Sequence, residues 1–71
     1  MSVRGIPLPG LKLARMRALF TQEALAHRAT VDRNTVARLE TGDRAALSTV
    51  RKLAEALGVD PDALMGPAAK G

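Results

Sequence analysis

The 71-residue sequence predicts an all-α fold, a compact bundle of five short helices. Valine is the sole β-branched aliphatic residue after Ile6, and the valines never alternate with polar residues as a strand requires. Capping residues and glycines interrupt the apolar pattern at short intervals, so each helix spans only a few turns. A chain of this length holds one hydrophobic core, and we expect one domain.

The first two helices are expected over residues 11–18 and 22–29. Thr21 can cap the second helix, and Glu23 suits its first turn, where the helix dipole is positive. Apolar residues at helical spacing mark the inner side of these two helices: Leu11, Ala14, Leu25, Ala26 and Ala29.

A tight turn at residues 30–31 leads to a third helix, expected from Arg33 to about Thr41. Asp32 has the chemistry of its N-cap. Gly42 ends this helix, because a left-handed backbone costs glycine nothing.

The fourth helix ends at Leu57, but the sequence leaves its start open. Ser48 is a good cap residue, yet it lies one turn late if Leu47 is already helical. Asp60 followed by Pro61 predicts a fifth helix over residues 61–65, because proline favours the first helical position.

Both ends of the chain have the composition of irregular segments. Residues 1–9 contain two prolines and a glycine and predict an irregular N-terminal arm, whereas residues 67–71 predict a flexible C-terminal tail. The folded domain is therefore expected over residues 10–66.

The composition argues against several classes of protein. Cysteine is absent, and the single histidine, His27, cannot build a zinc site without carboxylates. No apolar run approaches the ~20 residues that cross a bilayer, and the proline-broken N-terminus is no secretory signal, so a cytoplasmic protein is expected. Asp60 and Asp62 lack a nearby nucleophile or histidine. We expect no enzyme, no cofactor and no metal site, and no small-molecule ligand is evident.

The net charge of +4 is unevenly distributed. The first 20 residues contain no acid and four bases: Arg4, Lys12, Arg15 and Arg17. This excess suits an anionic partner near the first helix or the N-terminal arm, although a charge of this size can also serve only solubility. The absence of Trp and Tyr argues against a reader of single-stranded nucleic acid, which stacks bases on several rings.

The second and third helices, joined by a short turn, form a candidate helix-turn-helix. In the third helix, Val36 and Leu39 point inward with Glu40 beside them. Arginine can contact guanine through two hydrogen bonds, and asparagine can contact adenine in the same way, so the opposite face of this helix suits base reading. The alternative is an ordinary solvated helix face. That opposite face comprises Arg33, Asn34, Ala37, Arg38 and Thr41.

The start of the second helix presents free backbone N–H groups, which suit a phosphate. The amide of Gln22 can donate to that phosphate or brace Arg33, whereas the charge of Glu23 works against an anion there.

The segments FTQEALA, VDRNTVARLETG and LAEALGV, in this order and spacing, resemble the phage-repressor and Cro-type helix-turn-helix family, also called the XRE family. The resemblance covers residues 11–65 and implies a λ-repressor-like bundle with its third helix in the major groove of DNA. It implies base reading by Arg33, Asn34, Ala37 and Arg38, and phosphate contacts from Gln22 and from residues 41–44, including Thr41 and Arg44. It also implies a structural ion pair between Arg15 and Glu40.

The sequence departs from the family pattern at two loops. Leu19 stands where the family often has glycine, so that turn is made differently or under strain. The loop of residues 43–46 lacks the common proline, and Asp43 replaces a frequent lysine, which weakens one expected phosphate contact.

Leu13 and Met16 lie on the normally polar side of the first helix. With Ile6 and Leu8 they would form an exposed apolar patch, which often marks an interface; the alternative is that the N-terminal arm folds back and covers them. Near the C-terminus, Leu57, Leu64 and Met65 are expected in the core or in a dimer contact.

Together these observations predict a bacterial or phage transcriptional regulator, a repressor that binds double-stranded DNA as a homodimer on a palindromic operator. Further phosphate contacts are expected from Lys12, Arg17 and Arg4, whose arm could enter a minor groove. The alternative is a protein-interaction module of the same fold, antitoxin-like or coactivator-like, that binds a protein partner with the apolar side of its first helix.

Overall fold

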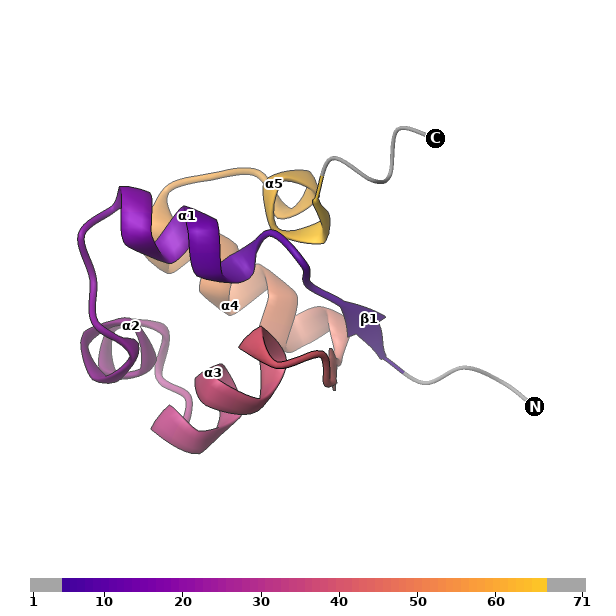
Figure 1. The fold of residues 1–71 in the computed structure, drawn as a ribbon, viewed down its shortest axis with the longest axis horizontal. Helices are drawn as coiled ribbons and strands as arrows, with labels where there is room; N and C mark the ends of the chain where they lie inside the picture. The colour runs from indigo at the N-terminus through magenta and orange to yellow at the C-terminus, as the bar shows by residue number, and fades with distance from the viewer. Residues whose placement is uncertain (1–4, 67–71) are drawn as a thin grey trace.

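The computed structural model of the chain describes residues 5–66, which form five helices and one pair of very short strands (Figure 1). This confirms the prediction of a helical bundle and adds the strand pair. The elements in chain order are β1 (Ile6–Pro7), α1 (Leu11–Arg17), α2 (Gln22–Ala29), α3 (Arg33–Glu40), β2 (Arg44–Ala45), α4 (Leu47–Leu57) and α5 (Pro61–Met65).

α4 passes behind α1 in Figure 1. α2 packs against both α3 and α4, and α5 packs against α1 and α4. α1 also contacts α3, so the helix-turn-helix formed by α2 and α3 is supported from two sides. None of the helices in residues 5–66 is long and apolar enough to span a membrane.

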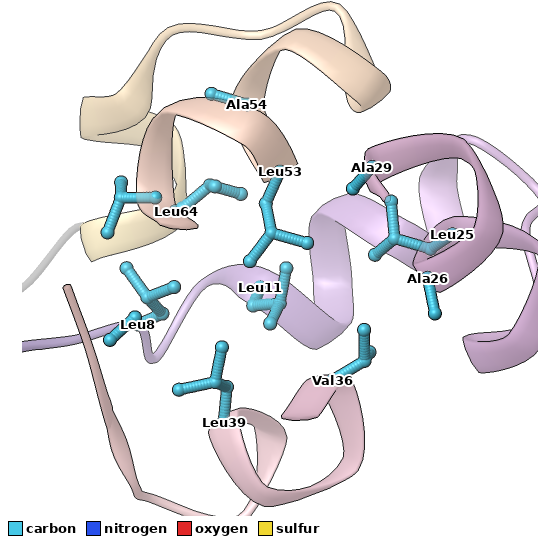
Figure 2. Close-up of a cluster of buried hydrophobic side chains, with 12 residues drawn as sticks. Leu8, Leu11, Leu25, Ala26, Ala29, Val36, Leu39, Leu53, Ala54 and Leu64 are labelled. Carbon is cyan, nitrogen blue, oxygen red and sulfur yellow. The ribbon is translucent and has the colours of Figure 1, made fainter. Parts of the chain in front are cut away.

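The core lies where the five helices meet, and Figure 2 shows leucine side chains from different helices pointing into one shared space. Every helix contributes at least one fully buried side chain, so no helix is an appendage. The largest of these side chains are Leu11, Leu25, Leu53, Leu64, Val36 and Val50. Among the described residues no polar or charged residue is fully buried.

The predicted N-cap residues lie at the N-cap positions, but only one of them makes the expected capping hydrogen bond. The Thr21 hydroxyl accepts a hydrogen bond from the Ala24 backbone N–H at 2.9 Å, which confirms it as the cap of α2. Asp32 and Asp60 occupy the N-cap positions of α3 and α5, but neither carboxylate accepts a capping hydrogen bond. α4 begins at Leu47, so its first turn has no side-chain cap.

The N-terminal segment differs from the predicted irregular arm. Ile6 and Pro7 pair antiparallel with Ala45 and Arg44, and Leu8 is only 2% exposed. Burial of Leu8 in the core outweighs the irregular character of the flanking prolines. Residues 1–4, with the predicted minor-groove contact of Arg4, and residues 67–71 lie outside the described range.

Gly10 permits a close approach between the segment after β1 and α5. Its N–H donates to the Leu64 carbonyl oxygen at 2.8 Å. A β-carbon at this position would lie 2.4 Å from the Ala63 carbonyl oxygen, a distance that only displacement of the backbone could relieve. Gly10 therefore holds the start of α1 against α5.

The turn between α1 and α2 is made under strain. Leu19 adopts a left-handed backbone with φ of 62°, and its side chain is 90% exposed. The backbone conformation that glycine would adopt freely is thus present without the glycine.

We expect Leu19→Gly to raise the free energy of unfolding by roughly 0.5–1 kcal/mol. The left-handed backbone costs a residue with a β-carbon about 1–2 kcal/mol, and the greater freedom of glycine in the unfolded chain offsets part of the gain. Urea denaturation measures the change. Leu19→Ala is the matched control, because it also removes the exposed side chain but keeps the β-carbon. Equal stabilisation by both variants would contradict the explanation by strain.

Candidate nucleic-acid interface

The outer face of α3 is a polar surface held on a buried base. Val36 is fully buried and Leu39 is 4% exposed, which fixes the rotation of the helix. The side chains on the other side therefore face solvent: Arg33, Asn34 and Arg38 are exposed, Ala37 between them is half-buried, and Thr41 is exposed at the C-cap. Small Ala37 leaves the backbone of α3 accessible to a close-fitting partner.

An ion pair joins α3 to α1. The Arg15 Nε donates to Glu40 Oε2 at 2.5 Å and Nη2 donates to Oε1 at 3.2 Å, a two-point contact with strong geometry. The two side chains are 12% and 4% exposed. Arg15 also donates from Nη1 to the Phe20 carbonyl oxygen at 2.7 Å, so one guanidinium joins α1, α3 and the strained turn. The pair that the family resemblance implies is present.

Burial and charge oppose each other at Glu40. Burial acts to raise the pKa of the Glu40 carboxyl, because it disfavours the charged form. The hydrogen bonds from Arg15 and Gln22 act against it, as do the charges of Arg15 and Lys12. These attractions outweigh burial, so the pKa of Glu40 lies below its ordinary value and the carboxylate stays ionised at neutral pH.

Gln22 takes part in this cluster and not in a contact with Arg33. Its amide Nε2 donates to Glu40 Oε1 at 3.0 Å, and among the described residues no side-chain hydrogen bond joins it to Arg33. Arg33 could be braced only through the Gln22 amide oxygen, because a guanidinium donates and does not accept, and no such hydrogen bond is present in residues 5–66. The second amide hydrogen and the first-turn backbone of α2 remain for another partner.

Arg38 has a partner that the sequence did not indicate. Its Nε lies 3.5 Å from Asp43 Oδ2, and the two side chains are 66% and 54% exposed. Asp43 and Arg38 are separated by the end of α3 and the turn at Gly42, where φ is 114°. The turn thus brings the acid back over the helix face that carries the arginine.

The other described basic residues that were predicted to contact phosphate divide between two sides of the molecule. Lys12 is exposed on α1 and lies close enough to Glu40 to influence its pKa. Arg44 is exposed on β2, directly after the end of α3. Arg17, by contrast, lines a groove between α1 and α5, away from α3. The structure therefore brings Lys12 and Arg44 toward the α3 side and does not bring Arg17 there.

The predicted apolar patch is rearranged. Leu13 and Met16 are 54% and 53% exposed, so residues 5–10 do not cover them, but Leu8 is in the core and Ile6 is partly buried against it. The N-terminal segment packs toward β2 instead of toward this side of α1.

The three residues near the C-terminus also separate. Leu64 is 0% exposed to solvent and belongs to the core, which is one of the two roles expected for it. Leu57 is half-buried and lines the groove that Leu13 also lines, and Met65 is half-buried against the core.

Arg28 of α2 makes a contact that the sequence did not predict. The only hint was that Phe20 is the single aromatic residue of the chain. The guanidinium of Arg28 lies 5.6 Å from the centre of the Phe20 ring, a cation–π distance. His27 is exposed, and residues 5–66 contain no group of three side chains that could hold a metal ion.

Comparisons with known proteins agree with this geometry. A helix-turn-helix family model matches residues 11–64, which span α1 to α5. A crystal structure described as the hypothetical transcription factor NHTF from Neisseria is similar, with a TM-score of 0.73 and 34% sequence identity over 84% of this chain and 70% of that chain. No curated protein matches the sequence. The chain belongs to the Cro/C1-type helix-turn-helix family, the XRE family.

Proposed function

We propose that the protein is a transcriptional repressor that binds double-stranded DNA sequence-specifically, as a homodimer on a palindromic operator, with α3 in the major groove. Family membership and the similar transcription factor support a DNA-binding regulator. One observation carries the finer assignment: Arg33, Asn34 and Arg38 share an exposed face of a helix whose other face is anchored in the core.

Base reading requires a helix that does not move relative to its own domain. α3 is held by Val36 and Leu39 on its inner side and by the Arg15–Glu40 pair at its end. A helix on such a support loses little additional backbone freedom on binding, which favours discrimination between bases.

The phosphate contacts follow from the ends of the helices. The first turn of α2 with the second amide hydrogen of Gln22 suits one phosphate, and Arg44 suits a second beyond the C-terminus of α3. The Thr41 hydroxyl donates to the Arg38 carbonyl oxygen at 2.8 Å and would have to turn to join this second contact. Lys12 on α1 adds charge on the same side. Arg17 is a weaker candidate, because it lies beside the α1–α5 groove.

A second copy would complete the site. One domain reads about half a site, and a two-fold arrangement places the second α3 about 34 Å away, one turn of DNA. Repression then follows from occupation of the operator. A bacterial or phage protein with this function works in the cytoplasm, on nucleoid DNA.

The function is tested by selecting bound duplexes from a pool of random DNA sequences. The affinity for the selected sequence is then measured at several salt concentrations. We expect a two-fold symmetric motif bound at least ~10³ times more tightly than random DNA. Steep salt dependence without a motif would indicate a non-specific binder. Absence of binding at low salt would contradict the proposal altogether.

We expect Arg38→Ala and Asn34→Ala each to lose about 1–3 kcal/mol of binding free energy on the selected motif and to relax preference at one base position. Arg44→Ala is the comparison, because loss of a phosphate contact weakens all sequences alike and lowers the salt slope by about 1. Fluorescence anisotropy on motif and random duplexes measures both quantities. The same proportional loss on both duplexes for all three variants would contradict the base-reading assignment.

The exposed apolar side of α1 favours a second candidate, a protein-interaction module. Leu13 and Met16 are about half exposed, and Leu13 also lines the groove beside α5. The selection experiment separates the two functions, because a module that only binds proteins would retain no duplex at low salt.

A further inference from the structure

Asp43 is anchored to its neighbours by three contacts. Its backbone N–H donates to the Arg38 carbonyl oxygen at 3.0 Å, and its Oδ1 accepts from the Arg44 N–H at 2.9 Å. The other carboxylate oxygen, Oδ2, lies 3.5 Å from Arg38 Nε. The two backbone contacts hold the negative charge of Asp43 beside the Arg38 guanidinium.

We propose that Asp43 is a positioning residue that sets the base specificity of Arg38. This inference rests on the proposed function, because it assigns a role in base reading. The carboxylate approaches Nε, which leaves the Nη1–Nη2 edge of the guanidinium available to another partner. That edge carries parallel N–H donors, which match the O6 and N7 acceptors of guanine.

The charge of Asp43 also acts against wrong partners. An unpaired arginine on this exposed face would bind any DNA phosphate. A carboxylate beside it repels the phosphate backbone of DNA and so reduces the sequence-independent attraction of the protein to DNA. Arg38 is 66% exposed and Asp43 54% exposed, so both charges reach the surface that DNA would meet. Asp43 thus lowers binding to random DNA while it orients the arginine for one base.

The experiment compares Asp43→Asn with the wild-type protein on the selected motif, on motif variants at each position, and on random DNA. Asparagine keeps the shape and the acceptor for the Arg44 N–H but removes the charge. We expect random DNA to bind about 3–10 times more tightly with a salt slope larger by about 1, and the guanine preference at one position to fall about 5–10-fold.

Two controls separate positioning from a general change of charge. In an Arg38→Ala background, Asp43→Asn should leave base preference unchanged, because the two residues act on the same position. Asp62→Asn removes an exposed carboxylate on α5 and should leave base preference unchanged in the wild-type background. The melting temperature of Asp43→Asn should stay close to that of the wild type, because exposed ion pairs contribute little to stability.

The outcomes distinguish this inference from the function on which it rests. If the wild-type protein selects no motif, the proposed function fails and the role of Asp43 fails with it. If the wild-type protein selects a motif but Asp43→Asn keeps the full guanine preference, only the role of Asp43 is overturned. The same holds if Asp43→Asn shifts base preference equally with and without Arg38.

Discussion

Replacing Glu40 with alanine is expected to lower the free energy of unfolding by about 3–5 kcal/mol at pH 7. The variant leaves the Arg15 guanidinium, 12% exposed, without its carboxylate partner, and it leaves the Gln22 amide without its acceptor. A domain of this length has a total stability of about 4–10 kcal/mol. The loss would therefore remove a large share of the total stability of the domain.

Urea denaturation followed by circular dichroism measures this loss. Asp43→Ala is the matched control, because it removes the carboxylate of the exposed Arg38 pair and should cost less than about 1 kcal/mol. A loss of less than about 1 kcal/mol for Glu40→Ala as well would mean that the Arg15–Glu40 pair contributes no more than a surface pair.

The pH dependence gives an independent check on Glu40. Its pKa in the folded protein is lowered, so the folded state favours the ionised form. The resulting stabilisation is complete above the unfolded pKa of about 4.3 and is lost as the pH falls through the lower folded pKa. The stability difference between wild type and Glu40→Ala should therefore shrink below about pH 4. A difference that grew on acidification would contradict the sign of this pKa shift.

Replacing Leu8 with alanine is expected to cost about 2–5 kcal/mol, the usual range for a leucine removed from a packed core. Leu8 is 2% exposed and belongs to the cluster in Figure 2, together with Leu11, Leu39 and Leu64. A residue in an irregular arm would have no such effect, so this variant tests the fold of the N-terminal segment. Thermal and urea denaturation give the change in the free energy of unfolding.

Leu13→Ala provides the comparison for Leu8→Ala. It makes the same chemical change on a leucine that is 54% exposed, and it should alter the free energy of unfolding by less than about 1 kcal/mol. Equal effects at the two positions would show that the N-terminal segment does not pack as described.

Local signals in the sequence were sufficient for the helices and for the exposed face of α3. Thr21 and Gly42 act within a few residues of themselves, through a capping hydrogen bond or a left-handed backbone, so their effect does not depend on the rest of the fold. The spacing of Val36 and Leu39 likewise determined which side of α3 is buried. The Arg15–Glu40 pair, 25 residues apart, was available only through the family resemblance.

The tertiary structure alone decided what each exposed or polar side chain contacts. By itself, the sequence determined the helices, the turns between them and the outward direction of Arg33, Asn34 and Arg38, because periodicity and caps are local properties. It did not determine the burial of Leu8 or the contact of Arg38 with Asp43. Those depend on where β1 and the turn after α3 come to lie, and that position results from packing between segments distant in the chain.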